Sequence, residues 1–213
     1  MVRVGLIDGA VCPELGRRLF AVRGPNPRSG LSFGHGSMVT RSVLEHAPDV
    51  EIALAQVFGS DRQASVEQVI DALQWLKDLN VQIVNLSFGL RLKVPRLACA
   101  IESVAAQGVI VVASGPARGQ PVYPAAYDAC VSVTGDARCA PGEISWLRGE
   151  AAEFGTHSLT DRSQPIRGGG ASIASARMSG LIARLLGDGV AKQNIREVLI
   201  ERARYVGREF RRD

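Results

Sequence analysis

Five short apolar runs recur along the first two thirds of the chain, and stretches with helical spacing separate several of them. The runs are Val2–Ile7, Ile52–Phe58, Ile83–Phe88, Val109–Ser114 and Cys130–Thr134. Continuous apolar runs of this length are typical of strands buried in a parallel sheet, where a crossover helix usually joins one strand to the next. The sequence therefore predicts an α/β fold of three layers, with a mostly parallel central sheet and helices on both faces.

Two intervening helices have recognisable ends. Ser65 and Gln68 form a capping-box-like pair that starts a helix running to Asp78. A second helix is predicted over Arg96–Gln107, ending before Gly108, where a glycine suits a left-handed cap.

The last third of the chain has weaker periodicity. Residues 135–170 are rich in Gly, Arg, Glu and Ser, which predicts loops and short irregular strands. Helices are expected over Ala171–Leu186 and Asn194–Tyr205, followed by a polar, solvated tail over 208–213.

Composition narrows the class of protein. With 213 residues, 46% of them hydrophobic, the chain can bury one sizeable core, and we expect a single domain over residues 1–213. The formal charge is +4, but the basic residues are scattered and only 5% of residues are aromatic, so we expect no nucleic-acid partner.

The four cysteines and the start of the chain bear on location. Cys12, Cys99, Cys130 and Cys139 form no CxxC pair and no zinc-type spacing with histidine, so we expect reduced, mostly buried thiols and neither metal nor cofactor. The first residues lack the pattern of a secretory signal, and no apolar run approaches the ~20 residues that span a membrane. We therefore expect a cytoplasmic protein without a membrane partner or a prodomain.

Three segments place a chemically versatile residue beside glycine, at the end of a strand or the start of a helix. They are Ile7-Asp8-Gly9, Gly34-His35-Gly36 and Gly170-Ala171-Ser172. Each has a simpler interpretation when taken singly, since Asp-Gly is a common turn and serine is a common helix cap. Together they offer a carboxylate, an imidazole and a hydroxyl, the groups of a nucleophilic hydrolase.

The other candidates are weaker. His46 and His157 are expected at the surface, the first at a helix end and the second in a polar loop. The glycine run 168–170 could cradle a phosphate, but it does not directly follow a predicted strand and no Lys-Ser/Thr pair comes after it.

The three segments occur in the order that is characteristic of the subtilisin family, and three further segments between them fit the same pattern. From Val4 to about Leu186 the chain resembles a subtilisin-like serine peptidase, with additional matches at Val84–Gly89, Val111–Gly115 and Tyr123–Tyr127. The resemblance implies a subtilisin-like fold and an Asp8–His35–Ser172 catalytic triad. It also implies that a protein or peptide substrate lies extended along Ser87-Phe88-Gly89.

The same resemblance assigns the pocket for the residue before the scissile bond. Ala113, Ser114 and Gly115 would line one wall, and Val122 would lie near the floor. Because valine is branched at Cβ, we expect a small or medium substrate residue in this pocket.

The chain departs from the family at the oxyanion position. The family has an asparagine there, whereas this chain has Pro116, which offers neither a side-chain amide nor a backbone N–H. Ser114, Arg118 and Gln120 are candidates to supply the missing donor. The insertion that holds calcium in many secreted members is absent after His35, so no metal site is expected.

Two functions remain open. The retained triad residues favour a slow serine endopeptidase that processes one dedicated partner protein, as a maturation peptidase removes a leader peptide. Pro116 alone favours a catalytically weak or inactive protein that holds a peptide without cleaving it.

Overall fold

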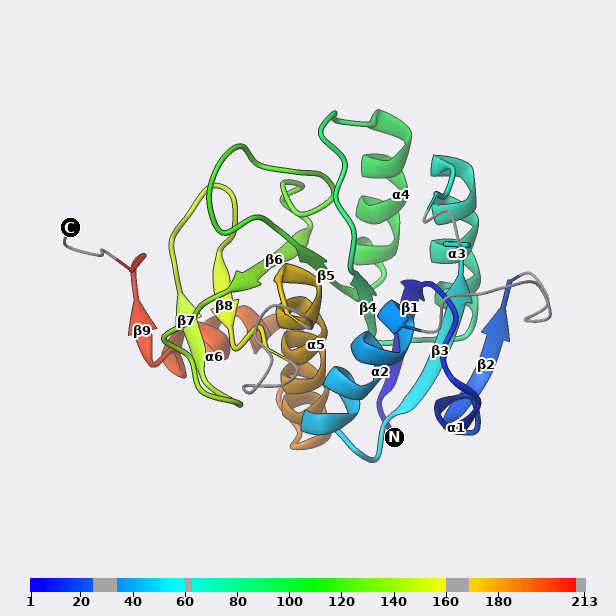
Figure 1. Cartoon of the computed structure of the whole chain (residues 1–213), viewed down its shortest axis with the longest axis horizontal. Coiled ribbons are helices and arrows are strands. Elements are labelled where there is room, and N and C mark those ends of the chain that lie inside the picture. The colour runs from blue at the N-terminus through cyan, green and yellow to red at the C-terminus, as the bar shows by residue number, and fades with distance from the viewer. Residues whose placement is uncertain (25–33, 60–62, 160–168, 210–213) are drawn as a thin grey trace.

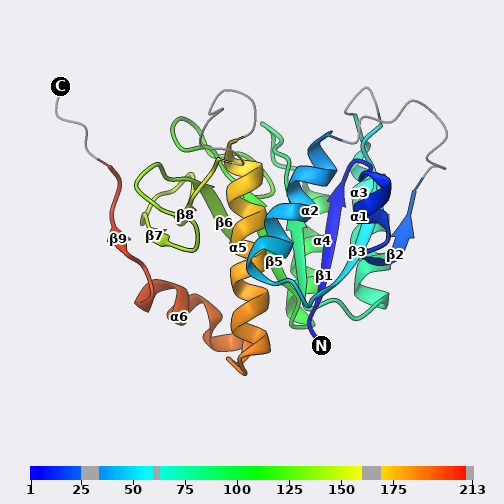
Figure 2. The ribbon, with the colours of Figure 1, turned by 60° about the horizontal axis from the view of Figure 1, so that its bottom comes forward.

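The computed structural model describes residues 1–24, 34–59, 63–159 and 169–209. In these ranges the chain forms a nine-stranded sheet with helices against both faces (Figures 1 and 2). In order across the sheet, the strands are β2 (Leu19–Arg23), β3 (Glu51–Gln56), β1 (Arg3–Asp8), β4 (Ile83–Leu86), β5 (Ile110–Ser114), β6 (Cys130–Gly135), β8 (Phe154–Thr156), β7 (Ile144–Trp146) and β9 (Tyr205–Val206). Neighbouring strands are parallel except for the antiparallel pair β7 and β8, which confirms the predicted α/β fold.

Each face of the sheet has its own apolar core. On one face lie α2 (Gly34–His46), α5 (Ala171–Gly187) and the shorter α6 (Ile195–Glu201), and their apolar side chains form one cluster with the sheet. On the other face lie α3 (Val66–Asp78) and α4 (Pro95–Ala106), which form the second cluster. A short helix α1 (Pro13–Gly16) and a 3₁₀ turn (Lys192–Asn194) complete the helices of the described residues.

The predicted helix ends are confirmed where their signals were local. Ser65 Oγ accepts a hydrogen bond from the Gln68 N–H at 3.1 Å, and Gln68 Oε1 accepts one from the Ser65 N–H at 2.7 Å, so the capping box starts α3. At the end of α4, Gly108 has a φ of 81°, a left-handed conformation that glycine adopts without steric cost.

The predictions failed where pairing between distant segments decides the structure. β2 was not expected at all. The helix predicted over Asn194–Tyr205 stops at Glu201, because the chain then pairs with β7. There the Arg204 N–H donates to the Ile144 carbonyl at 2.7 Å and the Gly207 N–H donates to the Trp146 carbonyl at 2.8 Å.

Two expectations about burial were also wrong. His157 is buried rather than at the surface, since its Nδ1 lies 3.0 Å from the Cys139 carbonyl oxygen beneath the 136–143 turn. His46 is half-buried, and burial lowers the pKa of its imidazole. Among the cysteines, Cys130 and Cys139 are buried, but Cys99 is exposed on α4 and Cys12 is partly exposed.

The helices α2 and α5 touch at a glycine. A Cβ atom on Gly180 of α5 would lie 2.5 Å from the Val43 carbonyl oxygen of α2 and 3.1 Å from the His46 Cβ. No larger residue fits without moving one backbone, so Gly180 allows the two helices to approach closely. No helix in the described part of the chain is both long and apolar enough to cross a membrane.

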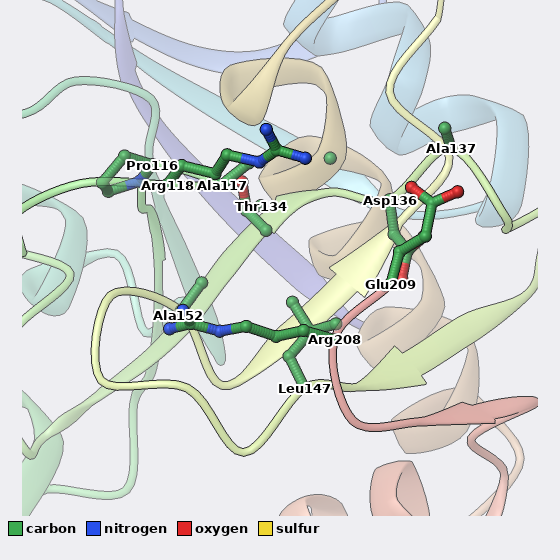
Figure 3. A pocket seen from close by; sticks show the side chains of 11 residues that line it. Pro116, Ala117, Arg118, Thr134, Asp136, Ala137, Leu147, Ala152, Arg208 and Glu209 are labelled. Carbon is green, nitrogen blue, oxygen red and sulfur yellow. The ribbon is translucent and has the colours of Figure 1, made fainter. Parts of the chain in front are cut away.

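Two hollows open along the edge of the sheet where its parallel strands end, which is where such sheets usually place their sites. The first lies over β1 and β4 and is lined by Asp8, Gly9, Gly34, His35, Met38, Phe58, Gly59, Ser87 and Phe88. The second has a volume of about 630 Å³ and lies over the ends of β5 and β6, beside Pro116 (Figure 3).

Candidate active site

Asp8 and His35 form a close pair in the first hollow. Asp8 is the last residue of β1, where its side chain is buried. Its carboxylate accepts a hydrogen bond from the Gly9 N–H at 2.7 Å, and its two oxygens lie 2.8 and 3.0 Å from Nδ1 of His35. The imidazole is 44% exposed on its other side, so one nitrogen is held by a buried carboxylate while the rest of the ring remains accessible.

The glycine after His35 makes this pairing possible. A Cβ atom on Gly36 would lie 2.4 Å from the Gly9 carbonyl oxygen and 2.7 Å from that of Ala10, closer than real Cβ contacts come. The first turn of α2 therefore packs directly on the chain leaving β1. This contact explains why the histidine is followed by glycine in the sequence.

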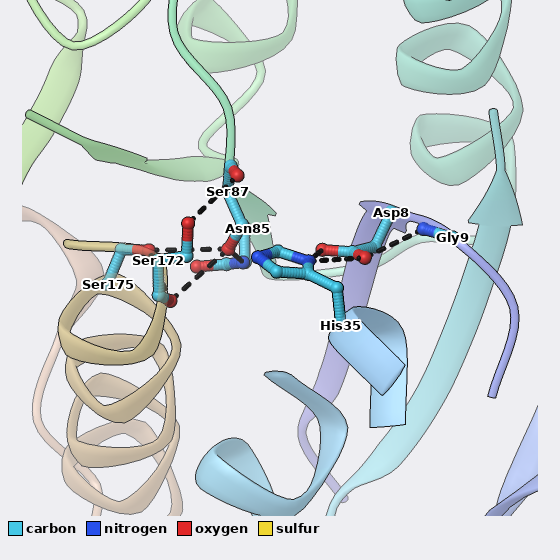
Figure 4. Close-up of polar contacts among 7 residues, drawn as sticks. All are labelled: Asp8, Gly9, His35, Asn85, Ser87, Ser172 and Ser175. Atoms are coloured by element: carbon cyan, nitrogen blue, oxygen red, sulfur yellow. Dashed lines mark hydrogen bonds and ion pairs between the residues drawn. The ribbon is translucent and has the colours of Figure 1, made fainter. Parts of the chain in front are cut away.

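Ser172 is the second residue of α5 and contacts Ser87, which lines the same hollow. Figure 4 shows the imidazole of His35 between Asp8 and Ser172, with its second ring nitrogen on the side of the serine. The Ser172 hydroxyl donates to the Ser87 carbonyl oxygen at 3.1 Å. Because a serine has one hydroxyl hydrogen, the Ser172 O–H must turn away from the Ser87 carbonyl before it can donate to His35.

The helix start provides an N–H group for negative charge. Gly170 precedes α5 with a φ of 128°, and its carbonyl accepts hydrogen bonds from the Ile173 and Ala174 N–H groups. The Ser172 N–H is one of the first-turn donors that a helix cannot satisfy from its own carbonyls. It therefore lies next to the hydroxyl and points out of the helix end.

A buried polar network connects this turn to β4, and the sequence indicated no separate role for its members Asn85, Ser175 and Ser179. The Asn85 amide donates to Ser87 Oγ at 2.7 Å, and Ser179 Oγ donates to Asn85 Oδ1 at 3.1 Å. The Ser87 and Ser175 hydroxyls both reach the Ser172 carbonyl, at 3.3 and 3.0 Å. A run of serines every three or four residues on a small-residue helix was the available signal.

The buried Arg177 holds the segment that leads to Ser172. Its guanidinium donates to the His157 and Leu159 carbonyls at 3.0 and 2.7 Å and to the Glu45 carboxylate at 2.9 Å. Leu159 in turn forms an isolated bridge with Gly169. Gly168, which belongs to the predicted glycine run, lies outside the described residues.

The segments expected to bind substrate lie around β4 and β5. Val122 packs against Gly89, since a Cβ atom on that glycine would lie 2.9 Å from Val122 Cγ2. The neighbouring Leu90 and Tyr123 exchange backbone hydrogen bonds of 2.6 and 2.8 Å, so the two segments close on each other. Farther along the loop, burial raises the pKa of Tyr127, whose hydroxyl donates to the Val94 carbonyl at 3.0 Å.

The proposed pocket wall is less open than expected. Ala113 is fully buried in the core on the α3 and α4 face, and Ser114 and Gly115 are also buried at the end of β5. Ser114 Oγ donates to the Phe88 carbonyl at 3.4 Å. Contact of substrate with Ser87, Phe88, Gly89, Ala113, Ser114, Gly115 and Val122 stays a prediction.

Pro116 borders the second hollow. Of the three candidates for a substitute donor, Ser114 already donates to Phe88, and Gln120 is exposed in the turn that follows. Arg118 lines the same hollow as Pro116 (Figure 3). In the described parts of the chain, no group of three His, Cys, Asp or Glu side chains is placed to hold a metal ion.

Comparison with known proteins agrees with this architecture. The model of the Subtilase family matches residues 29–212, a range that includes His35 and Ser172 and begins after Asp8. Subtilisin DY of Bacillus licheniformis is 28% identical over 152 residues, which cover 62% of this chain and 55% of that protein. Subtilisin BL of Lederbergia lenta is 28% identical over 148 residues, covering 62% and 54%.

A longer relative gives the same picture. The alkaline protease of Alkalihalobacillus alcalophilus is 28% identical over 148 residues, covering 62% of this chain and 38% of that protein. The chain thus spans about half the length of the two subtilisins that it matches. Since the family model covers most of the sequence and the fold has the expected sheet, the chain belongs to the subtilase family.

Proposed function

We propose that the chain is a serine endopeptidase in which Asp8, His35 and Ser172 form the catalytic triad. The observation that carries the proposal is the contact of His35 Nδ1 with both oxygens of the buried Asp8, at 2.8 and 3.0 Å. A buried carboxylate that holds an imidazole in one orientation beside a serine is the arrangement that activates a hydroxyl for attack on a carbonyl.

The mechanism follows from these positions. Ser172 attacks the scissile carbonyl while His35 takes its proton, and His35 later passes that proton to the leaving amine. Asp8 keeps the proton on Nδ1, so that the other ring nitrogen can act as the base, and it stabilises the imidazolium once formed. The peptide lies extended along Ser87-Phe88-Gly89, with a small or medium residue before the cleaved bond.

Charge on the substrate oxygen is the weak point of this site. The Ser172 N–H can donate to the oxyanion, but Pro116 adds no second donor. Loss of one donor lowers turnover by about 10²–10³-fold, a magnitude already known for subtilisin. We propose that Arg118, rather than Ser114 or Gln120, compensates in part, because it shares a hollow with Pro116 while Ser114 Oγ is turned toward Phe88. Asp or Ala at all three positions would leave turnover unchanged if no substitute exists.

Low intrinsic turnover suits a processing enzyme with one partner, and we propose that the chain removes a segment from a single protein. A candidate reaction is removal of the leader from the small subunit of quinohaemoprotein amine dehydrogenase during its maturation. The four cysteines, all within the described residues and all unpaired, support a cytoplasmic location, where thiols stay reduced.

The alternative function is peptide binding without cleavage, and Pro116 is the observation that favours it. Covalent labelling by a fluorophosphonate separates the two, because only an activated serine reacts. We expect one label per chain at Ser172 and none in Ser172→Ala. Folded wild-type protein that takes no label would favour the binding protein.

The substrate proposal needs its own experiment. The wild-type and Ser172→Ala forms are each co-expressed with the amine dehydrogenase small subunit, and the subunit is weighed by mass spectrometry. A loss of mass with the wild type and a trapped, uncut subunit with the variant would support leader removal. An unchanged subunit beside a labelled Ser172 would reject this substrate while leaving the peptidase in place.

A further inference from the structure

The hollow beside Pro116 is polar and lies across β5 from the segment expected to bind the acyl part of the substrate. Its walls are formed by the turn after β5, the end of β6, the loop before β8 and the chain after β9. Its lining residues are Pro116, Ala117, Arg118, Thr134, Gly135, Asp136, Ala137, Leu147, Ala152, Arg208 and Glu209. Pro116 and Arg118 belong to the proposed oxyanion region, whereas none of the residues assigned above to the triad or to the pocket before the scissile bond is among them.

Short contacts connect this hollow to the nucleophile. Gly135, on its wall, pairs in register with Thr156 of β8. Thr156 Oγ1 donates to the Ala174 carbonyl at 2.9 Å, in the first turn of α5 that carries Ser172. Pro116 borders the hollow on its other side. Since the acyl part of an extended peptide is proposed to lie on Ser87-Phe88-Gly89, after β4, the part beyond the scissile bond would continue toward β6 and this hollow.

The carboxylate of Asp136 in the hollow has a cationic partner. Asp136 is held by Arg138, whose Nη2 donates to Oδ2 at 2.7 Å and whose Nε donates to Oδ1 at 3.1 Å. Burial opposes the charged form of Asp136, but hydrogen bonds led by those from Arg138 lower its pKa. The hydrogen bond to Asp136 is the main cause that raises the pKa of Arg138, and the negative charge of Glu209 adds to it.

The two remaining cations are differently placed. No hydrogen bond or ion pair among the described residues uses the guanidinium of Arg118 or Arg208. Figure 3 shows Asp136 and Glu209 toward one end of the hollow and the guanidinium groups of Arg118 and Arg208 away from that end. Asp136 is thus neutralised by Arg138, and among the described lining residues the positive charge on the Pro116 side of the hollow is that of Arg118 and Arg208.

We infer that this hollow binds an acidic side chain of the substrate, in the segment that follows the scissile bond. The inference rests on the proposed function, since it deepens the substrate class of the same site. A guanidinium can hold a carboxylate with two parallel hydrogen bonds. A substrate Gln or Lys at the same position has no carboxylate and cannot form that pair. Such recognition would give a slow peptidase a narrow choice of substrate.

The test uses internally quenched peptides with alanine before the scissile bond and Glu, Gln or Lys at each of the first three positions after it. At one position, we expect kcat/KM for Glu to exceed that for the isosteric Gln by about tenfold, the value of one charge-assisted hydrogen bond. The Glu-to-Gln ratio is the measurement, because any effect of a variant on the chemical step cancels in it.

Variants then assign the effect. Arg118→Gln and Arg208→Gln should each lower the ratio toward 1, and Arg208→Glu should make Lys the preferred residue. Arg17→Gln is the matched control, since it removes an exposed arginine beside α1, across the sheet from the hollow, and should keep the ratio. Equal rates for Glu and Gln in the wild type, or a ratio unchanged in both hollow variants, would overturn the inference.

Two further measurements distinguish its failure from that of the peptidase. A peptide ending in a fluorogenic amide has no residue after the bond, so its cleavage reports only the proposed triad. If it is cut while Glu and Gln peptides are cut equally, the inference alone fails. If nothing is cut, binding of the Glu and Gln peptides to Ser172→Ala is measured by fluorescence anisotropy. Tighter binding of the Glu peptide that is lost when Arg208→Gln is added would support the inference, and equal binding of the two peptides would reject it.

Discussion

The two sides of Ser172 are built differently. On one side, the Gly9 N–H holds the buried carboxylate of Asp8, and that carboxylate holds the His35 imidazole. The close contact of Gly36 with the Gly9 carbonyl brings the two segments together. On the proposed oxyanion side, Pro116 borders an open polar hollow and has no N–H to donate. In the proposed mechanism, the groups for proton transfer are therefore held in place, whereas a donor for charge on the substrate oxygen is missing at Pro116.

Removing either proton-transfer partner should have the largest effect. We expect Ser172→Ala or His35→Ala to lower kcat by about 10⁶-fold, which is the magnitude already known for subtilisin. The double variant should be no slower than either single variant, because the two residues act as one unit. Additive losses in kcat, measured on a fluorogenic peptide, would show that they act separately.

Asp8→Asn should be the next largest change. An asparagine amide can donate to Nδ1 of His35 and so favours the wrong tautomer, for which a loss of about 10⁴-fold in kcat is expected. Urea unfolding of the variant provides the control, since a folded but slow protein is predicted. A loss below tenfold in a folded variant would remove Asp8 from the triad.

Pro116→Asn should supply the donor that the proposed oxyanion position lacks. We expect kcat to rise by about 10²-fold, the lower end of the effect known for this position in subtilisin. Pro116→Ala is the matched control, because it removes the proline ring without adding a side-chain amide. If the Asn variant is no faster than the Ala variant, the oxyanion is already satisfied by another group.

Arg177→Met tests the anchoring behind the nucleophile. Methionine has a similar length but leaves the His157 and Leu159 carbonyls without their donor, so we expect about 2–3 kcal/mol less free energy of unfolding in urea. The control is Arg96→Met, whose ion pair with Glu67 is 71% and 59% exposed and contributes at most about 1 kcal/mol. Equal effects of the two substitutions would deny Arg177 its anchoring role.

Val122→Ala should have the smallest effect. Removing two methyl groups beside Gly89 widens the pocket before the scissile bond, so kcat/KM for Leu relative to Ala at that substrate position should rise by about tenfold. A paired set of peptides differing only at that residue measures the ratio. An unchanged ratio would place Val122 outside the pocket.

Local signals predicted much of the fold. The apolar runs located β1, β3, β4, β5 and β6, and the Ser65–Gln68 pair marked the start of α3 to the residue. The short strands β7 and β8 lie in the stretch predicted to hold short irregular strands, whereas β2 and β9 were missed because they are short strands at the sheet edges, where pairing with a distant strand stabilises them more than their own periodicity does.

The candidate site was predicted less evenly. The glycine neighbours of Asp8 and His35 were visible in the sequence, and the structure brings these two side chains together. The burial of His157, the network through Asn85 and Ser179, and the hollow shared by Arg118 and Arg208 were not predictable. Each depends on polar partners that are distant in the chain, for which no sequence period exists.

The contact at Gly180 has a consequence for the proposed triad. His35 and Ser172 lie on separate helices, and those helices touch at Gly180, which is two turns along α5 from Ser172. A methyl group added at Gly180 would collide with the Val43 carbonyl of α2 and force α2 and α5 to move relative to each other. The distance between His35 and Ser172 thus depends on a contact far from both residues, and a substitution there would change the proposed site without touching a bound peptide.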